Sequence, residues 1–489
     1  MKTGATVYSR TLLVISLLEV VVWLGFVLLP SNSASATSEW PRFRGSDGAG
    51  IGAGQELPIE FGPKTNLIWQ VAVPAGCSSP IASGNRVWLT GYEGNLRMVR
   101  CLELSHGRRL WQQVLETTRA ERKSLPNDAA SSTPVTDGEN VYALFSGFGL
   151  VSYGSKGEMR WQVPLPAFTQ PHGMSSSPVI AGKQVIVVAD QVQGSYLAAF
   201  DLKSGQLKWR TARPNFVGGY STPVIWRDQV LVAGPLELAA YACSNGTRLW
   251  SIPKMGVMPI SSPELSGERI FVNNGAVPPF EALAKELKGD RNGDGKLTPE
   301  EFPDPSFKEA VLAIDRVYGN GDGAVDQAEW DGALKLMESL NTLVAVELTT
   351  PHPRESWRSE KIFADVASPL VYQNVLYLLK DGGLLSGLEP DNGKVLWREK
   401  VADSSGRYFA SPVAGNGKVY LVSESGKASV IKAGRVFGRL SVNELGENCY
   451  ATPAIAGRFL LIRTVHRLWA FASGSQQEES RFSRPLKRE

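Results

Sequence analysis

Twelve consecutive residues, 290 to 301, carry the clearest chemistry in this chain. They read Asp-Arg-Asn-Gly-Asp-Gly-Lys-Leu-Thr-Pro-Glu-Glu, and this spacing matches the twelve-residue calcium-binding loop at each diagnostic position. Ca²⁺ is a hard cation that takes oxygen ligands, so such a loop supplies side-chain oxygens, one backbone carbonyl and a closing bidentate carboxylate. The predicted ligands are Asp290, Asn292, Asp294, the carbonyl of Lys296, Thr298 directly or through water, and Glu301.

A second loop is expected to follow, because calcium loops of this kind normally occur in pairs. An alignment on Asp322-Gly323 fills loop positions three, five, seven, nine and twelve with Asn320, Asp322, Ala324, Asp326 and Glu329. Position one is then Tyr318, which has no carboxylate, and Asp315 lies three residues too early unless the loop is distorted. We therefore expect this loop to bind Ca²⁺ weakly or to serve as the structural mate of the first.

Helical patterns surround both loops. Apolar residues recur at helical spacing over residues 280–287, 307–314 and 333–340. Thr298 and Glu301 have the spacing of a capping box, with Pro299 at the first helical position. The sequence predicts a compact calcium-binding module of the EF-hand type, with four helices, over residues 276–341. We expect Ca²⁺ to order this module without opening a groove.

The rest of the chain is a repeat whose mark is Ser or Thr followed by Pro. The marks are Ser79-Pro80, Thr133-Pro134, Ser177-Pro178, Thr222-Pro223, Ser262-Pro263, Ser368-Pro369, Ser411-Pro412 and Thr452-Pro453. Each unit reads as four short strands with a Gly turn before the last, and a period of roughly 40 to 55 residues is typical of propeller blades. The sequence therefore predicts an all-β, eight-bladed β-propeller.

The elements of each blade can be placed from the same marks. A Pro is tolerated at the first residue of a strand, so each mark begins an innermost strand. Six closing Trp residues are expected to fill the space between neighbouring sheets: Trp111, Trp161, Trp209, Trp250, Trp357 and Trp397. The eighth unit supplies only three strands, and residues 66–72 are expected to complete it. The calcium module falls in the loop between the second and third strands of blade five.

The ends of the chain suggest export. Lys2 and Arg10 flank the start of an apolar stretch that leads to Ser33-Ala34-Ser35-Ala36, so residues 1–36 are predicted to be a signal peptide or, if uncleaved, a membrane anchor through residues 11–29. The remaining predicted segments are an extension at 37–65, blades over 66–275 and 342–472, and a polar tail at 473–489. We expect the body to lie in the periplasm or elsewhere in the cell envelope, or to be secreted.

Composition narrows the class of function. A net charge of +3 over 489 residues gives no electrostatic case for a nucleic-acid partner. The four cysteines have neither metal-site nor haem-attachment spacing. Cys77 and Cys449 precede the marks of units one and eight, which adjoin in a closed ring, so a disulfide across that seam is a hypothesis. No nucleophile, phosphate or metalloprotease motif is present, and we assign no catalytic or organic cofactor-binding residues.

The repeat resembles the pyrroloquinoline-quinone-like propeller family over roughly residues 60–472, through its Ser-Ser-Pro starts and Thr/Ser-Gly-x-x-x-Trp ends. The segment Trp40-Pro41-Arg42-Phe43-Arg44-Gly45 looks like the entry of exported members similar to BamB, the scaffold lipoprotein of outer-membrane barrel assembly. The resemblance implies a monomeric ring that binds other envelope proteins.

The same resemblance leaves open a quinone-dependent dehydrogenase or other redox enzyme. Such enzymes use a bound quinone, a calcium ion inside the ring and an Asp base, often with a vicinal Cys pair and an attached haem. This chain has no adjacent cysteines and no haem motif, and its recognisable calcium loop lies outside the ring repeat. We therefore expect Ca²⁺ as a cofactor and do not expect the quinone.

Overall fold

The computed structural model describes residues 39–474 apart from 55, 120–125, 169, 171, 192–193, 214–217, 257–258, 275–279, 287–288, 303–307, 309–310, 313, 317–318, 337–341, 350–351 and 403–405. The predicted signal or anchor and most of the polar tail lie outside the described residues, as does Tyr318. Within the described ranges, no helix combines the length and apolar character needed to cross a membrane.

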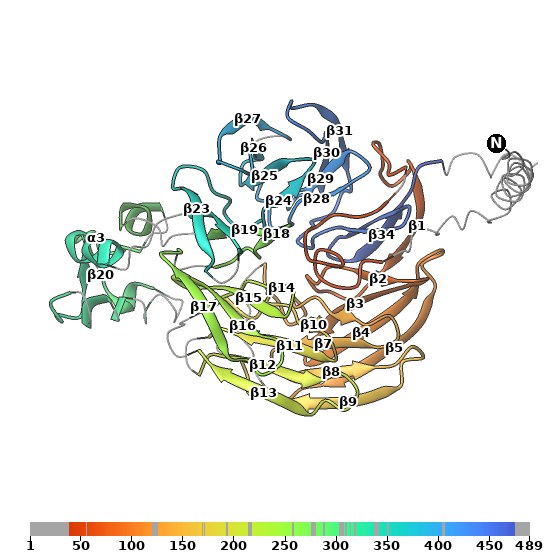
Figure 1. Ribbon diagram of the computed structural model, residues 1–489, viewed down its shortest axis with the longest axis horizontal. Helices are drawn as coiled ribbons and strands as arrows, with labels where there is room; N and C mark the ends of the chain where they lie inside the picture. Colours follow the sequence, from red (N-terminus) through yellow and green to blue (C-terminus); the bar gives the residue numbers. More distant parts are fainter. Residues whose placement is uncertain are drawn as a thin grey trace, which may run out of the picture. The chain divides into compact units, whose positions relative to one another are not determined.

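Eight four-stranded antiparallel sheets confirm the predicted all-β, eight-bladed propeller. They are arranged around a common centre, with short strands such as β14, β18, β24 and β28 nearest to it (Figure 1). Blade one consists of β2 (Ile81–Ser83), β3 (Arg86–Glu93), β4 (Leu96–Glu103) and β5 (Arg109–Glu116), and blade two of β6 (Val135–Thr136), β7 (Val141–Phe145), β8 (Gly149–Tyr153) and β9 (Met159–Pro164). Blade three consists of β10 (Val179–Ala181), β11 (Gln184–Ala189), β12 (Tyr196–Asp201) and β13 (Leu207–Ala212), and blade four of β14 (Val224–Trp226), β15 (Gln229–Gly234), β16 (Glu237–Ala242) and β17 (Arg248–Pro253). Blade five consists of β18 (Glu264–Ser266), β19 (Arg269–Asn274), β22 (Thr342–Glu347) and β23 (Arg354–Ser359), and blade six of β24 (Leu370–Tyr372), β25 (Val375–Lys380), β26 (Leu384–Leu388) and β27 (Val395–Lys400). Blade seven consists of β28 (Val413–Gly415), β29 (Lys418–Val422), β30 (Lys427–Lys432) and β31 (Arg439–Glu444), and blade eight of β32 (Ala454–Ala456), β33 (Phe459–Arg463), β34 (Arg467–Phe471) and β1 (Leu67–Ala72).

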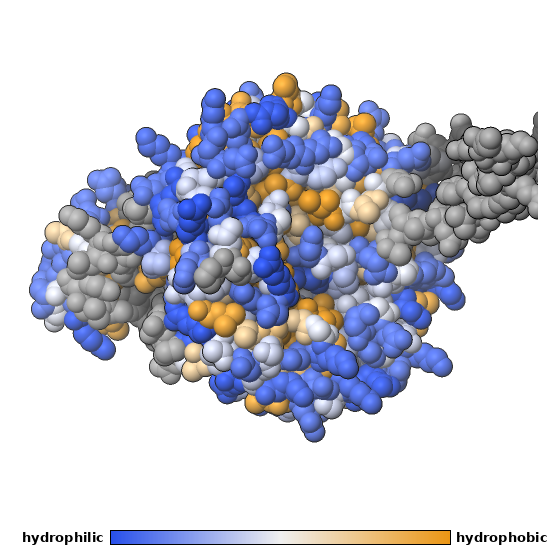
Figure 2. Space-filling model, in the orientation of Figure 1, coloured by the Kyte–Doolittle hydropathy of each residue, from blue (hydrophilic) through white to orange (hydrophobic). Residues whose placement is uncertain are grey.

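Alternate side chains of the second strand in a blade pack into two different cores. In β11, Val185 and Val187 join a buried cluster that includes residues of blade two, whereas Ile186 and Val188 join a cluster that includes residues of blade four. Because successive side chains of a strand point to opposite faces, a continuous β-branched run is buried on both sides. Hydrophilic side chains cover much of the outer rim, and apolar side chains gather in patches nearer the middle of the face shown in Figure 2.

The closing Trp of blade two links it to blade three. Trp161 at the end of blade two is buried, and its Nε1 donates to the carbonyl of Leu202 in blade three at 2.9 Å. Gly205 of blade three lies against the same indole, with φ at +72°, and a Cβ there would stand 2.7 Å from the ring. The Gly turn of the repeat is thus required by both its backbone angle and the Trp of the preceding blade.

The strand β1 closes the ring. It pairs with β34, with Gln70 opposite Trp469, and is the outermost strand of blade eight. Trp69 of β1 then donates from Nε1 to the carbonyl of Leu104 in blade one at 2.8 Å, as Trp161 does between blades two and three. Joining the two ends of the repeat in one sheet covers an edge that would otherwise be unpaired.

Residues between β19 and β22 form a separate small unit. Its elements are a π-helical turn η1 (Ala282–Glu286), β20 (Lys296–Leu297), a 3₁₀ turn η2 (Pro299–Glu301), β21 (Val325–Asp326) and α3 (Gln327–Leu336). This unit has its own buried cluster, which includes Phe280, Leu283, Phe302 and Trp330, and none of the cluster's core residues comes from a blade. The segment between the second and third strands of blade five therefore builds its own core.

Candidate functional site

A belt of Ser and Thr hydroxyl groups surrounds the centre of the ring. At seven blade junctions of the described chain, the backbone N–H of one mark donates to the side-chain oxygen of the next mark at 2.9–3.0 Å. The pairs run Ser79 to Thr133, Thr133 to Ser177, Ser177 to Thr222, Thr222 to Ser262, Ser262 to Ser368, Ser368 to Ser411, and Ser411 to Thr452. This explains why the mark is Ser or Thr rather than any small residue.

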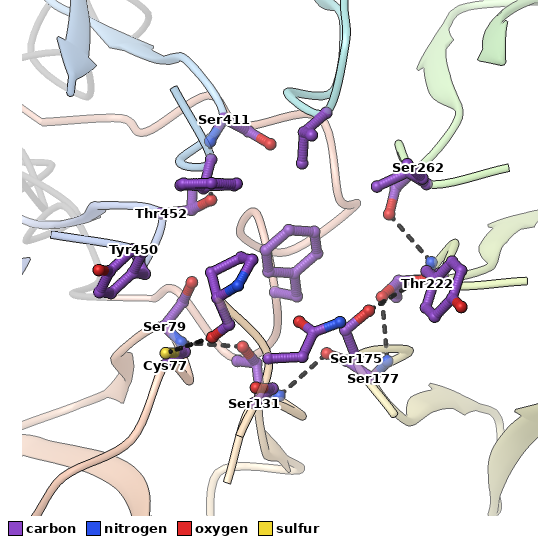
Figure 3. A pocket seen from close by; sticks show the side chains of 18 of the residues that line it. Cys77, Ser79, Ser131, Ser175, Ser177, Thr222, Ser262, Ser411, Tyr450 and Thr452 are labelled. Carbon is purple, nitrogen blue, oxygen red and sulfur yellow. Dashed lines mark hydrogen bonds between the residues drawn. The ribbon is translucent and has the colours of Figure 1, made fainter. Parts of the chain in front are cut away.

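The belt lines a pocket of about 340 Å³ in the channel of the propeller. Figure 3 shows the hydroxyl-bearing side chains distributed around it, with Ser79, Ser177 and Thr222 labelled on different blades. Further lining residues come from the loops before the marks, among them His172, Tyr220, Arg407, Phe409 and Tyr450. The ring centroid of His172 lies 6.0 Å from that of Tyr220.

The N-terminal extension closes one end of this channel. Phe43 lines the pocket, and the two flanking arginines reach carbonyl groups of the marks. Arg42 donates to the carbonyl of Pro223 at 2.9 Å, and Arg44 donates to that of Pro369 at 2.5 Å. The Trp-Pro-Arg-Phe-Arg-Gly segment, a family marker in the sequence, is therefore the floor of the channel.

A buried ion pair anchors the floor. Arg44 Nη2 lies 3.0 Å from Glu264 Oε2, and both side chains are fully buried. Burial raises the pKa of Glu264 to about 8, although the positive charge of Arg44 opposes that shift. Burial likewise lowers the pKa of Arg44. The desolvation of both groups makes this pair sensitive to the loss of either partner.

The hypothesis of a seam disulfide is wrong, because Cys77 and Cys449 are both free thiols. Cys77 Sγ donates to the carbonyl of Pro126 at 3.0 Å, and Cys449 Sγ donates to that of Arg463 at 3.1 Å. Burial raises the pKa of Cys449 to about 12, which keeps it a protonated donor at neutral pH. Each sulfur is thus directed to a different backbone carbonyl and not to the other thiol.

In the first predicted calcium loop, the carboxylates are gathered by backbone N–H groups. Asp290 accepts hydrogen bonds from the N–H groups of Gly293 and Gly295 at 2.7 and 3.0 Å. Glu301 accepts from the N–H groups of Arg291 and Thr298 at 2.9 and 2.8 Å. Although partial burial raises the pKa of Glu301, these hydrogen bonds lower it overall. The first and last acidic residues of the loop are therefore both held by backbone N–H groups of the loop.

The second loop repeats this arrangement with Asp315 in the first position. Asp315 is buried, and its two oxygens accept from Gly321 and Gly323 at 2.8 and 3.0 Å. The first of these contacts spans six residues, where the corresponding contact of Asp290 spans three. Glu329 accepts from Asn320 at 2.9 Å, and it closes the loop as Glu301 does. Extra residues before Asn320 thus let Asp315 make the contacts that the alignment assigned to position one.

The two loops are joined by a short antiparallel bridge. Lys296 pairs with Asp326 and Leu297 with Val325, and both apolar residues of the bridge enter the core of the unit. In the part of the chain that the structure describes, no three acidic, His or Cys side chains converge as a metal centre. The loop carboxylates are instead turned toward backbone N–H groups, and the remaining predicted ligands Asp294 and Thr298 stand on the same loop.

Two features of these sites were missed in the sequence. The hydroxyl belt could have been inferred from the restriction of the mark to Ser or Thr, because a purely steric role would also allow Ala. The role of Asp315 had only a weak signal, since its distance from Gly321 departs from the standard loop spacing.

These observations define a closed eight-bladed propeller with a plugged, hydroxyl-lined channel and an inserted unit that carries two acidic loops. A family model described as outer membrane protein assembly factor BamB matches residues 63–250 and 341–479, which is more than half of the chain. The chain belongs to this family. The match is interrupted over residues 251–340, where the inserted unit lies.

Individual relatives are distant. The chain is 24% identical over 279 residues to outer membrane protein assembly factor BamB of Shewanella oneidensis, covering 49% of this chain and 67% of that protein. The solved structure of BamB from Moraxella catarrhalis superposes with a TM-score of 0.55 at 12% identity, over 83% of this chain and 98% of that one. The solved structure of quinohemoprotein alcohol dehydrogenase from Comamonas testosteroni superposes with a TM-score of 0.56 at 11% identity, over 90% of this chain and 81% of that one. At such identities the two structures establish the fold alone.

Proposed function

We propose that this protein is an exported propeller scaffold of the cell envelope that binds other envelope proteins, and that its inserted unit binds calcium. The observation that carries the proposal is the location of carboxylate groups, which are present in the inserted loops and absent from the described lining of the channel pocket. None of the described residues that line the pocket is Asp or Glu, whereas both inserted loops hold ordered carboxylates. Membership of the family named for an outer-membrane assembly factor supports the scaffold role.

The calcium role rests on the chemistry of the two loops. Asp290, Asn292, Asp294, the carbonyl of Lys296 and Glu301 give the first loop the oxygen donors that Ca²⁺ prefers. Asp315 with Asn320, Asp322 and Glu329 gives the second loop a comparable set, so we propose two calcium ions per chain. Calcium present at about a hundred times its Kd would stabilise the unit by about 2.7 kcal/mol, which suits a structural site.

The alternative function, a quinone-dependent dehydrogenase, is less well supported. Enzymes with the related fold use a calcium ion and an acidic base inside the ring, and the described lining of this channel supplies hydroxyl, imidazole, guanidinium and aromatic groups instead. These residues do not fit a calcium ion, which requires several negatively charged or carbonyl oxygens. The structural likeness to a quinohemoprotein concerns the fold and not this site.

Two assays test the proposal. Capture of the tagged full chain from envelope membranes, with an untagged chain as control, should recover outer-membrane assembly proteins. Purified full chain supplied with pyrroloquinoline quinone and Ca²⁺ should show no dye-linked oxidation of alcohols or sugars above background. Turnover in the second assay, or failure to enrich any assembly protein in the first, would contradict the scaffold role.

A further inference from the structure

The hydroxyl belt has hydrogen-bonding capacity that the blades do not use. Its eight members are each at most 5% exposed, and a hydroxyl group offers one donor and two acceptor positions. Seven of the oxygens accept a backbone N–H from the preceding blade. Among the described residues, none of the hydrogen bonds of the belt uses a hydroxyl proton, and all eight hydroxyl groups line the pocket. A ligand with acceptor oxygens would satisfy them.

The closed floor restricts how a ligand can enter. Phe43 lines the pocket, and it lies between Arg42 and Arg44, which are hydrogen-bonded to carbonyl groups of blades four and six. A polypeptide therefore cannot thread through the ring at this point. Whatever binds must therefore end in the pocket.

The open end adds a cation and an aromatic surface. The guanidinium of Arg407 stacks 4.5 Å from the ring centroid of Phe409, and the rings of Phe409 and Tyr450 lie 5.7 Å apart. Arg407 is 58% exposed and lies 3.6 Å from its partner Asp381, which does not line the pocket. Arg has five N–H donors, so this contact leaves capacity for a second acceptor.

We propose that the channel binds an elongated ligand end-on, with a terminal carboxylate that accepts hydrogen bonds from the hydroxyl belt and from Arg407 and an apolar portion against Phe409 and Tyr450. The pocket volume of about 340 Å³ is in the range of small-molecule sites, which spans about 300–1,000 Å³. The same carboxylate chemistry is available from a free aromatic acid or from the C-terminus of a polypeptide. This site is independent of calcium binding and of the identity of any envelope partner.

The test titrates the full chain with both sources of carboxylate. One probe is 2-naphthoate with 2-naphthamide as its uncharged control, and the other is acetyl-Gly-Ser-Gly-Phe with its C-terminal amide as control. Calorimetry should show one site per chain for at least one acid, with its amide at least about tenfold weaker, a factor that corresponds to about 1.4 kcal/mol. Binding of the naphthoate alone identifies a free acid as the class of ligand, and binding of the peptide alone identifies a chain end.

Three variants locate the binding. Arg407→Gln should weaken the acid by about tenfold, whereas Arg458→Gln, which removes an exposed guanidinium stacked on Phe459 outside the channel, should not. Val366→Trp fills the pocket from the loop after β23 and should abolish binding while the unfolding midpoint stays near that of the native chain. Absence of binding by both acids at millimolar concentration, equal binding of the amides, or an equal loss in both Arg variants would overturn the proposal.

Discussion

The channel of the ring and the inserted unit present opposite kinds of hydrogen-bonding groups. The channel lines its pocket with hydroxyl groups and a guanidinium, whereas the inserted loops hold carboxylate oxygens that can bind a cation. The ring residues are repeated once per blade, and the loop residues occur in one insertion only. The ring and the inserted unit should therefore bind different solutes: the channel of the ring a carboxylate, and the inserted unit calcium.

The largest expected effect comes from the floor of the channel. Arg44→Met removes the guanidinium that contacts Glu264 and the carbonyl of Pro369, and it leaves a buried carboxyl group without its partner. At about pH 9, above the pKa of Glu264 of about 8, the carboxyl is ionised and loss of its buried partner costs about 3–5 kcal/mol, so the free energy of unfolding in urea at that pH should fall by that amount. Arg458→Met, an exposed control, should change it by less than about 0.5 kcal/mol. Equal losses of unfolding free energy in the two variants would show that the contacts of Arg44 stabilise the protein no more than an exposed arginine does.

Removal of calcium should affect the inserted unit and spare the ring. Chelation from a concentration of about a hundred times the Kd should cost the unit about 2.7 kcal/mol. Hydrogen exchange should then accelerate at the N–H groups of Gly293, Leu297 and Gly323, and remain unchanged in strands such as β11. Faster hydrogen exchange in the blades after chelation would show that calcium binds in the ring, and it would contradict a calcium site confined to the inserted unit.

The hydroxyl belt should contribute a smaller, local stability. Ser177→Ala deprives the buried N–H of Thr133 of its acceptor, and an unsatisfied buried donor costs about 1–3 kcal/mol. Ser175→Ala changes another hydroxyl group of the pocket, whose oxygen donates only a long 3.5 Å bond to Tyr220, and should cost clearly less. Thermal unfolding of the two variants measures the difference, and indistinguishable midpoints would contradict a structural belt.

The floor should also give a pH dependence that depends on Glu264. Burial raises its pKa in the folded state from 4.5 to about 8, so the folded protein holds a proton that the unfolded chain releases. The contribution to stability is present at low pH and is lost as pH rises from about 4.5 to about 8, with a slope of at most about 1.4 kcal/mol per pH unit. Subtracting the urea stability of Glu264→Gln at each pH should isolate this slope. A difference that rises with pH would contradict the assignment.

The parts of the protein that repeat could be predicted from the sequence, and the parts that occur once could be predicted only in part. Eight marks predicted eight blades because each Pro immediately precedes an inner strand, and the Gly turns of blades one to four and six lie next to a Trp of the preceding blade, as Gly205 does at Trp161. The role of Arg42 and Arg44 depends on contacts more than 150 residues away in sequence, which no local pattern encodes. The prediction of a disulfide between Cys77 and Cys449 was wrong for a related reason, because the adjacency of their blades in the ring did not specify the direction of each thiol.

Asp315 illustrates the limit of a spacing rule. The alignment placed Tyr318 at position one of the second loop, since it assumed the standard length. The carboxylate of Asp315 reaches the N–H groups of Gly321 and Gly323 across a longer segment, because hydrogen-bond geometry requires a position in space and not a fixed count of residues. A loop of unusual length can therefore present the same oxygen atoms as a standard one.

The most direct test of the account is a calorimetric calcium titration of the full chain and of two loop variants. We predict two ions per chain, one ion in Asp290→Ala and one in Asp315→Ala, with Asp331→Ala on α3 as a matched acidic control that keeps both. Circular dichroism of the blades should be the same in all four proteins. No calcium binding by the native chain, or two ions still bound in both Asp290→Ala and Asp315→Ala, would contradict the separation of the calcium site from the ring.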